Sequence, residues 1–349
     1  MNKKVGIIKD DRLLWHRISD RHKECPERLF HIYNNLQDWG LSEKLKTFSA
    51  IELTDEDIAT IHSPFYLKQI YEYSSSHEKS YKYDKDTYLM CDTPYVAKLA
   101  AGGCRVLADA IMNDEIDKGF ALIRPPGHHA ETGRAMGFCI FNNIALTAQY
   151  LIDKYKLERI LTIDFDVHHG NGTQEIFYNS SKVLNISIHQ NNIFPFTGKG
   201  LETGDEEGKG YNINIPVHPN FGNAEYYYIF GKYIQNIADN YLPQIILVSA
   251  GFDGHIDDNI SKIEITDEGY KTITALIMHI AQKTCRGKLL YILEGGYHIP
   301  SLCSGVKSAL EMLVEEQSNP PGFLFAPRAE KVIKSEIPEE IQLKWGFNN

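Results

Sequence analysis

Six short apolar runs recur along the chain of 349 residues, and they limit its possible folds more than any other feature. Each consists mainly of Ile, Val, Leu and Phe, which is typical of strands buried on both faces of a parallel sheet. These candidate strands are Val5–Ile8, Phe120–Ile123, Ile160–Ile163, Val183–Ile188, Ile245–Val248 and Leu289–Leu293. Helical patterns lie between them, at Tyr95–Met112, Asn142–Tyr155, Ala224–Asn240 and Asp267–Lys283. The alternation predicts an open or doubly wound α/β domain.

Composition and charge indicate a globular protein, which we expect in the cytoplasm. Hydrophobic residues make up 43% of the chain and charged residues 23%. No apolar run approaches the roughly 20 residues that a membrane helix needs, and the N-terminus lacks a signal-peptide pattern, so no membrane partner is expected. The six cysteines are widely spaced, which favours reduced thiols. A net charge of −10 without a basic block argues against nucleic acid as a direct partner.

Two polar segments, Ser74–Asp86 and Thr197–Gly210, are expected to be surface loops because they are rich in charged and turn-forming residues. Neither is long enough to force a domain boundary, and the sequence contains no internal repeat. We therefore expect a single domain over residues 1–349, with its chemistry-bearing motifs inside about 5–304 and a C-terminal extension, 305–349, packed on it. The sequence leaves the oligomeric state open.

Polar, glycine-flanked segments follow five of the candidate strands, at the point where each strand ends. They are RPPGHHA (124–130), DFDVHHGNGT (164–173), His189, SAGFDGH (249–255) and EGGYH (294–298). In parallel α/β sheets, ligands bind beyond the carboxyl ends of the strands, which lie at one edge of the sheet. The five segments are therefore expected to converge on one site.

The segment DFDVHH spaces Asp164, Asp166 and His168 two residues apart, so that on extended backbone they share a face. Asp and neutral His are ligands for a divalent ion such as Zn²⁺, and Asp253, from another strand end, can complete a set of three. Three protein ligands with one open position are typical of catalytic zinc, which lowers the pKa of bound water to about 7. The alternative is that these side chains only cap turns, which is the better reading for a single Asp or His but not for this group.

The adjacent histidines His128 and His129 follow a rigid Pro-Pro-Gly turn that can hold both rings in place. Histidine suits the general base and general acid that amide hydrolysis needs. Asp164 and Asn171 are candidate partners for the far ring nitrogens. Because Asp favours an imidazolium more than neutral Asn does, two unlike partners would separate the pKa values of the rings. The alternative is a pair of exposed loop histidines.

Tyr297 follows two glycines at a strand end, where its phenol can donate a hydrogen bond to a developing oxyanion. Phe138 and Phe194 are possible walls of an apolar channel, although each alone would suit an ordinary core. Together the candidates describe metal-assisted hydrolysis of a carbonyl compound. The residues by themselves identify neither an amide nor its leaving group.

The motifs RPPGHHA, GFCIFNN, DFDVHHGNGT, GFDGH and LEGGY occur in the order found in the zinc-dependent histone deacetylase family, which the chain resembles. That family includes acetoin-utilisation proteins and acetylpolyamine amidohydrolases. The early HKECPERL (His22–Leu29) is similar to its N-terminal motif, and the match extends over roughly Val5 to Ser304. The resemblance implies an arginase-like α/β fold, with a central, mostly parallel sheet of about eight strands flanked by helices.

The resemblance also implies roles for individual residues. One Zn²⁺ would be held by Asp166, His168 and Asp253, with Asp164 paired to His128, Asn171 paired to His129, and Tyr297 polarising the acetyl carbonyl. Residues that would bind substrate are Gly137, Phe138 and Phe194 along an acetyl-lysine tunnel, Gly296 and Ile260 near it, and Asp86 at its rim. A structural K⁺ would be held by Asp164, Ser187 and the backbone carbonyls of Asp166, His168 and Ile188.

Some positions narrow the subgroup that the resemblance implies. Asn171 is similar to the class II branch and its bacterial relatives, where class I members usually have Asp. Members specific for acetylated polyamines can carry an acidic gatekeeper after GFD, and the equivalent here is Ile260, with Asp257 and Asp258 nearby. His298 replaces an Asn that is common after the motif tyrosine.

Four functions are weighed. The leading hypothesis is a zinc amidohydrolase that removes acetyl or another acyl group from lysine side chains of a peptide or protein. The same chemistry on small acetylated amines is the second, a catalytically silent binding protein on this fold is the third, and an arginase-like enzyme with two Mn²⁺ is the fourth. The physiological substrate, the acyl-chain preference and the choice between Zn²⁺ and Fe²⁺ stay open.

Overall fold

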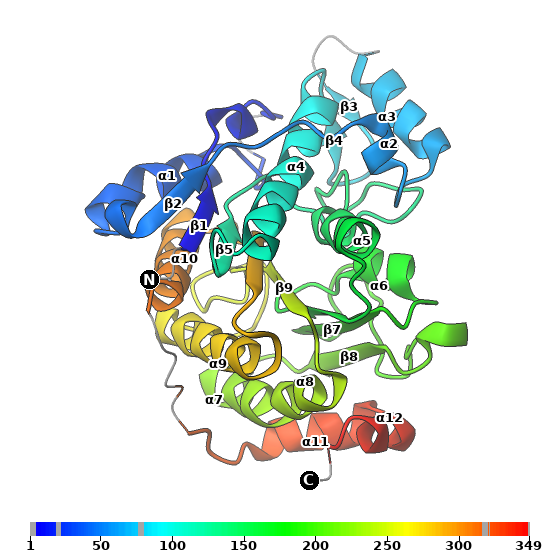
Figure 1. Cartoon of the computed structure of the whole chain (residues 1–349), viewed down its shortest axis with the longest axis vertical. Coiled ribbons are helices and arrows are strands. Elements are labelled where there is room, and N and C mark those ends of the chain that lie inside the picture. Colours follow the sequence, from blue (N-terminus) through cyan, green and yellow to red (C-terminus); the bar gives the residue numbers. More distant parts are fainter. Residues whose placement is uncertain (1–4, 19–21, 76–79, 316–319, 321, 348–349) are drawn as a thin grey trace.

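The computed structural model describes residues 5–18, 22–75, 80–315, 320 and 322–347. Its centre is a sheet of eight parallel strands in the order β2-β1-β5-β10-β9-β6-β7-β8, which confirms the expected architecture (Figure 1). The strands are β1 (Val5–Ile8), β2 (Leu45–Phe48), β5 (Lys118–Ala121), β6 (Ile160–Asp164), β7 (Val183–Gln190), β8 (Asn212–Val217), β9 (Ile245–Ala250) and β10 (Leu289–Leu293). Six of them coincide with the predicted apolar runs, within a few residues at each end.

The two strands that the pattern did not predict, β2 and β8, lie at the edges of the sheet. Strand β2 (LKTF) has two polar residues at its centre, and only Leu45 is buried, so it lacks the continuous apolar run of an inner strand. Strand β8 contains Asn212, Asn214 and Pro216, residue types that are depleted in strands. Both asparagine side chains donate to the side-chain carbonyl of Gln174, at 2.8 and 2.7 Å, so tertiary contacts satisfy what the local sequence disfavours.

Helices cover both faces of the sheet (Figure 1). Helices α4, α5 and α6 pack along one face; on the other, α9 packs with α10, α7 and α8, and α1 packs against α10. Their bounds are α1 (Glu27–Asp38), α4 (Thr93–Met112), α5 (Asn143–Tyr155), α6 (Asn171–Phe177), α7 (Asn223–Tyr228), α8 (Gln235–Tyr241), α9 (Asp267–Cys285) and α10 (Ile299–Leu313). The helix predicted over 224–240 consists of α7 and α8 joined by a π-helical segment, Ile229–Ile234.

The periphery carries the remaining elements: α2 (Asp55–Ile58), α3 (Pro64–Ser75), α11 (Pro327–Glu336), α12 (Glu339–Lys344), and a hairpin of β3 (Tyr81–Lys82) and β4 (Tyr88–Leu89). The loop predicted over Ser74–Asp86 is therefore wrong in part, because α3 enters it and β3 lies inside it; residues 76–79 lie outside the described part. Helix α11 packs against β8 and α7. None of the helices in the described ranges is long and apolar enough to cross a membrane.

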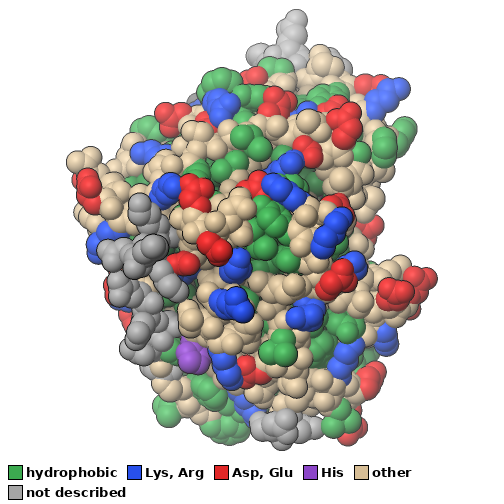
Figure 2. Space-filling model, viewed as in Figure 1, with side chains coloured by type: hydrophobic (Ala, Val, Ile, Leu, Met, Phe, Trp, Pro, Cys, Tyr) green, Lys and Arg blue, Asp and Glu red, His purple; other side chains and the backbone are tan. Residues whose placement is uncertain are grey.

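A buried ion-pair network ties the N-terminal segment to the sheet. The carboxylate of Glu24 accepts hydrogen bonds from Nε and Nη2 of Arg124 (2.8 and 2.7 Å), which lies just beyond β5. Arg28, on α1, lies 3.3 Å from the same carboxylate and donates from Nε to the carbonyl of Gly296 (2.7 Å), beyond β10. All three charged side chains are fully buried. On the face shown in Figure 2, by contrast, acidic and basic side chains are interspersed at the surface.

We expect Glu24→Gln to lower the free energy of unfolding by ~3–5 kcal/mol, because it leaves the buried guanidinium of Arg124 without its counter-charge. Chemical denaturation monitored by circular dichroism measures the change. Glu27→Gln is the matched control, since Glu27 pairs with Arg17 at the surface (2.6 Å) and should cost less than about 1 kcal/mol. Equal losses for the two variants would contradict the expectation.

The same pair predicts a dependence on pH. Burial alone would raise the pKa of Glu24, but Arg124 outweighs it and holds that pKa at about 2, below the ordinary value of 4.5. A carboxyl group whose pKa is lower in the folded chain stabilises the fold. This contribution is complete at a pH above the pKa of the unfolded chain, and it is lost as the pH falls toward 2. The difference in unfolding free energy between the native chain and Glu24→Gln should therefore shrink below about pH 4.5; a constant difference would contradict it.

Candidate active site

The polar segments that follow the strands meet at the carboxyl edge of the sheet, as their positions predicted. The tandem histidines come after β5, Asp166 and His168 after β6, Asp253 after β9 and Tyr297 after β10. Since β5, β10, β9 and β6 are neighbours in the sheet, these side chains are brought to one place.

Asp166, His168 and Asp253 form a tight buried cluster. Nδ1 of His168 lies 3.0 Å from Oδ1 of Asp166 and 3.0 Å from Oδ2 of Asp253. One atom from each residue lies within 4.8 Å of the others. Ligands at roughly 2.0–2.1 Å around a tetrahedral Zn²⁺ are about 3.3 Å apart, so the three atoms have the spacing of a metal-binding set.

Backbone amides fix both carboxylates of this cluster. Asp166 accepts from the N–H groups of His168 (2.8 Å) and Gly295 (2.9 Å), and Oδ1 of Asp253 accepts from the N–H of Val167 (3.0 Å). Oδ2 of Asp253 is buried, and its close polar contact is the ring of His168 at 3.0 Å, whose geometry does not make a hydrogen bond. An unsatisfied buried carboxylate oxygen is costly, and it fits a position whose partner is a cation.

The charges of the cluster favour a cation between the carboxylates. Burial, together with the charge of Asp166, raises the pKa of Asp253 to about 6. Burial opposes the charged form of His168, yet the hydrogen bonds and charges of Asp166 and Asp253 outweigh it and raise its pKa to about 10. The site therefore favours positive charge, as a proton on His168, and the same attraction would favour a metal ion there.

The tandem histidines have unlike partners and unlike protonation. Nδ1 of His128 hydrogen-bonds Oδ2 of Asp164 (2.9 Å), and Nδ1 of His129 hydrogen-bonds Oδ1 of Asn171 (2.8 Å). Burial opposes a charge on His128, but Asp164 and Asp166 raise its pKa to about 10. Burial and the charge of His128, whose ring centre is 4.0 Å away, hold the pKa of His129 well below its ordinary value. His129 is therefore the neutral ring of the pair.

Tyr297 is held from two sides. Its ring lies against the guanidinium of Arg28 (5.1 Å) and the ring of Phe138 (5.4 Å). Its backbone N–H donates to Oδ2 of Asp258 (2.7 Å), which also accepts from the N–H of His298 (3.0 Å). Asp258 therefore fixes the backbone of the tyrosine loop. It does not supply an acid at the Ile260 position.

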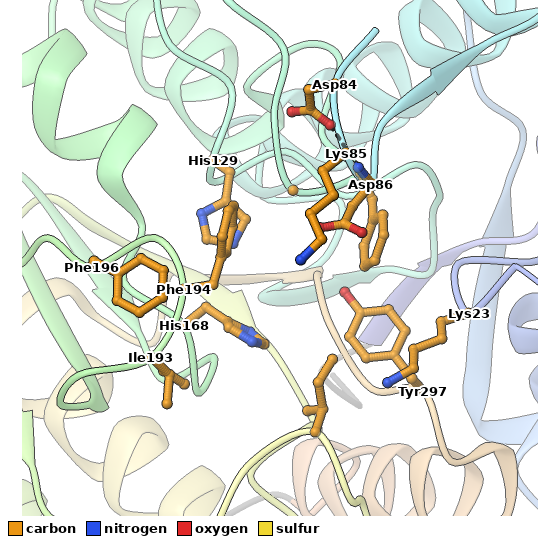
Figure 3. Close-up of a pocket in the computed structure, with 13 residues that line it drawn as sticks. Lys23, Asp84, Lys85, Asp86, His129, His168, Ile193, Phe194, Phe196 and Tyr297 are labelled. Atoms are coloured by element: carbon orange, nitrogen blue, oxygen red, sulfur yellow. Dashed lines mark hydrogen bonds between the residues drawn. The ribbon is translucent and has the colours of Figure 1, made fainter. Parts of the chain in front are cut away.

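A cavity of about 500 Å³ connects these groups to the surface, a size typical of small-molecule sites (Figure 3). Of the predicted substrate-binding residues, Gly137, Phe138, Phe194, Ile260 and Asp86 line it, together with His129, His168 and Tyr297. Gly296 is not among its lining residues. Gly137 has φ +53°, and an added Cβ there would lie 2.4 Å from the ring of His129, so the position requires glycine.

The residues predicted to bind K⁺ lie at the ends of β6 and β7. Asp164 and Ser187 are register partners on these adjacent strands. Oδ1 of Asp164 accepts from the N–H of Asp166 (3.0 Å), and the hydroxyl of Ser187 lies 2.9 Å from Nδ1 of His189. Asp166, His168 and Ile188 continue from the same two strands.

Several site residues were not predicted. Glu294 is fully buried and accepts from the backbone N–H groups of Gly127 (2.6 Å) and His128 (3.2 Å), which places it under the tandem histidines. Burial raises its pKa to about 7. It begins the EGGYH motif, which was the available signal. Lys23, Lys85, Ile193 and Phe196 also line the cavity, and nothing in their local sequence distinguishes them.

The sheet topology and the site together define a protein of the arginase and deacetylase fold class. A model of the histone deacetylase domain matches residues 22–313. A probable deacetylase of Archaeoglobus fulgidus is 35% identical over 341 residues, which are 95% of this chain and 94% of the relative. The solved HD domain of HDA15 has a TM-score of 0.90 and 31% identity, covering 99% of this chain and 96% of that one. The chain belongs to the histone deacetylase family.

Other relatives in the family differ in name and in length. The polyamine deacetylase HDAC10 of Mus musculus is 36% identical over 90% of this chain, but the chain spans only 48% of it. The histone deacetylase-like amidohydrolase of Pseudomonas aeruginosa is 31% identical over 89% of this chain and 88% of the relative. The family assignment therefore rests on relatives of similar length as well as on longer ones.

We expect Gly295→Ala to prevent metal binding, because an added Cβ would lie 2.3 Å from Oδ2 of Asp253 and 2.5 Å from Oδ2 of Asp166. Metal content after incubation with Zn²⁺ and dialysis measures the loss, and circular dichroism checks the fold. Gly133→Ala is the matched control, since an added Cβ there meets no atom within 4 Å. A full zinc complement in Gly295→Ala would contradict this reading of the cluster.

Proposed function

We propose that this chain is a zinc-dependent amidohydrolase that removes acetyl, or another acyl group, from the side chain of lysine. The observation that carries the proposal is the placement of His129, His168 and Tyr297 in one cavity, beside the buried carboxylates of Asp166 and Asp253, which could hold a metal ion. Membership of the histone deacetylase family supports it.

Asp166, His168 and Asp253 would hold the metal, which fits the spacing of their atoms and the unsatisfied oxygen of Asp253. When bound, a Zn²⁺ ion supplies Lewis-acid polarisation of the amide carbonyl and lowers the pKa of water. The carbonyls and side chains at the ends of β6 and β7, around Asp164 and Ser187, are the proposed K⁺ site. There a K⁺ ion would stabilise the loop that carries the zinc ligands.

His129 is the proposed general base, because a neutral ring has a free lone pair to accept a proton from the attacking water. Its Nδ1 is engaged by Asn171, so Nε2 is left to face the cavity. His128, held charged by Asp164, stabilises negative charge that develops during the reaction. Once protonated, His129 can return its proton to the departing lysine amine.

Tyr297 is the proposed donor to the carbonyl oxygen as it becomes an oxyanion. Its phenol keeps its proton, since burial raises its pKa well above the ordinary value. Phe138 and Phe194 would enclose the aliphatic part of the acyl-lysine side chain, because both rings line the cavity between the surface and the histidines. Asp86, at the rim, can accept a hydrogen bond from the substrate backbone.

Hydrolysis of small acetylated amines is the second candidate. The polyamine deacetylase of Mus musculus is 36% identical, which favours it. Against it, Ile260 lines the cavity where an acidic gatekeeper would attract a second ammonium, and Asp258 is committed to the backbone of Tyr297 and His298. We therefore propose acylated lysine side chains, rather than small acetylated amines, as the substrate.

Acyl release from an acetyl-lysine peptide and from N-acetylputrescine, with zinc-loaded protein, tests the proposal. We expect turnover of the peptide and a loss of about 10²–10³ in kcat for Tyr297→Phe, because one oxyanion donor is removed. Tyr155→Phe is the matched control, since that hydroxyl binds Asp109 on α4 and neither residue lines the cavity. Undiminished turnover in Tyr297→Phe would contradict the proposal, and preference for putrescine would favour the second candidate.

We expect Asn171→Asp to move the acidic limb of the kcat/KM profile to higher pH by about one unit or more. An anionic partner raises the pKa of His129, and the ring cannot accept a proton at a pH below that pKa. The pH profile on the acetyl-lysine peptide measures the shift. Asn113→Asp, which adds the same charge after the C-terminus of α4, is the control. An unmoved limb would show that His129 is not the base.

A further inference from the structure

Two lysines stand at the mouth of the cavity. Lys23 and Lys85 both line it, Lys85 points toward its centre, and Lys23 lies beside Tyr297 (Figure 3). Both side chains are exposed, and neither ammonium forms an ion pair or hydrogen bond with another residue in the described ranges. Asp84 and Asp86 line the same cavity, so its mouth carries two ammonium groups and two carboxylates that are not paired with each other, and both kinds of group are free to bind a ligand.

The two lysines come from segments that are distant in the sequence but fastened to each other by His22. Its Nδ1 lies 2.8 Å from the carbonyl of Glu24, and its Nε2 lies 3.1 Å from the carbonyl of Asp86. The His22 ring also packs edge-on against Tyr88 (5.5 Å) and Phe138 (5.0 Å). This contact places the residues next to His22 and Asp86, which are the two lysines, on the same rim.

The segment of Lys85 is further fixed by a turn. Oδ1 of Asp84 accepts from the backbone N–H groups of Asp86 (2.9 Å) and Thr87 (2.6 Å). The carboxylate of Asp84 therefore serves the backbone, whereas that of Asp86 stays exposed at the mouth and forms no ion pair with Lys85. One rim thus offers two ammonium donors and one carboxylate acceptor.

The opposite side of the mouth is apolar. Ile193, Phe194 and Phe196 lie across the cavity from Lys23 and Lys85 (Figure 3), and Phe196 is 75% exposed. A substrate that follows this wall inward meets hydrogen-bonding groups only on the lysine side. A carboxylate near Lys23 and Lys85 is attracted by both ammonium groups, and an N–H donor near Asp86 is attracted by its carboxylate, so this rim suits a group that carries both.

We propose that this mouth recognises the α-carboxylate of its substrate, so that the preferred substrate is an Nε-acyl-lysine with a free carboxyl group. Lys23 and Lys85 bind the carboxylate, and Asp86 accepts from the α-nitrogen of the same residue. This inference rests on the proposed function, because it specifies which acyl-lysine is the substrate. The carboxylate can belong to the free amino acid or to the last residue of a peptide, since both present a carboxylate and an N–H donor on the α-nitrogen.

The test compares Nα-benzoyl-Nε-acetyl-lysine with its carboxamide, which differs only by the charge at the mouth. We expect kcat/KM to be about tenfold higher for the acid, as two partly exposed ion pairs allow. The ratio of acid to amide should fall toward one in the double variant Lys23→Gln, Lys85→Gln. Lys44→Gln, an exposed lysine just before β2, is the matched control and should keep the native ratio. A native ratio near one, or an unchanged ratio in the double variant, would overturn the proposal.

A binding measurement separates this proposal from the proposed function. Calorimetric titration of the same pair into zinc-loaded Tyr297→Phe needs no turnover. Tighter binding of the acid by about tenfold, lost without the two lysines, supports recognition of the carboxylate even if the native chain hydrolyses neither compound. Equal binding overturns it even if both are hydrolysed. A side-by-side assay compares the free amino acid with a peptide that ends in Nε-acetyl-lysine, and it shows which source of the carboxylate is preferred. Preference for either compound over a peptide carboxamide supports the proposal.

Discussion

The carboxylate of Asp166 is the contact on which the arrangement of the site depends. It accepts the N–H of Gly295 from beyond β10, lies 3.0 Å from Nδ1 of His168 and 3.9 Å from Nε2 of His128, and so joins the ends of three strands. A buried carboxylate is tolerated only if cations and donors surround it. The need to satisfy this one group therefore determines where the tandem histidines and the tyrosine loop can lie.

A second group of buried charged residues, outside the Asp166 cluster, fixes the position of Tyr297. Glu24 binds Arg124 and Arg28, and Arg28 in turn holds the carbonyl of Gly296 and the face of the Tyr297 ring. The sheet thus positions the groups on its own strand ends directly, but it positions Tyr297 through an arginine on α1. Such a route is rigid only while the ion pairs are complete, because each guanidinium has lost its water.

Local sequence predicted the parts of this structure that depend on local chemistry. Apolar runs marked the six inner strands because their side chains are buried on both faces, whereas β2 and β8 stayed hidden because edge strands carry polar residues that distant contacts satisfy. The candidate partners of His128 and His129 were visible because Asp164 and Asn171 follow one strand end. The sequence did not predict that Lys23 and Lys85 lie together, since only His22 and the folded loops bring them close. The sequence placed Asp258 near Ile260, but it did not reveal that this carboxylate binds the backbone of Tyr297 and His298, because those partners lie 39 and 40 residues away.

Charges in the buried site interact strongly because water is excluded, whereas charges at the exposed mouth are screened. The residues proposed for catalysis and those proposed for substrate selection therefore differ in their environment. Around Asp166 and His128 the pKa shifts are large because water is excluded, so a change there alters the chemistry and the fold together. At Lys23 and Lys85 the charges are exposed, salt screens them over about 8–10 Å, and each contributes little to stability. Replacement of rim residues can therefore change which acyl amide enters without disturbing the groups that hydrolyse it. Under the proposed recognition of a carboxylate, charge at the mouth is the feature by which this chain would select its substrate.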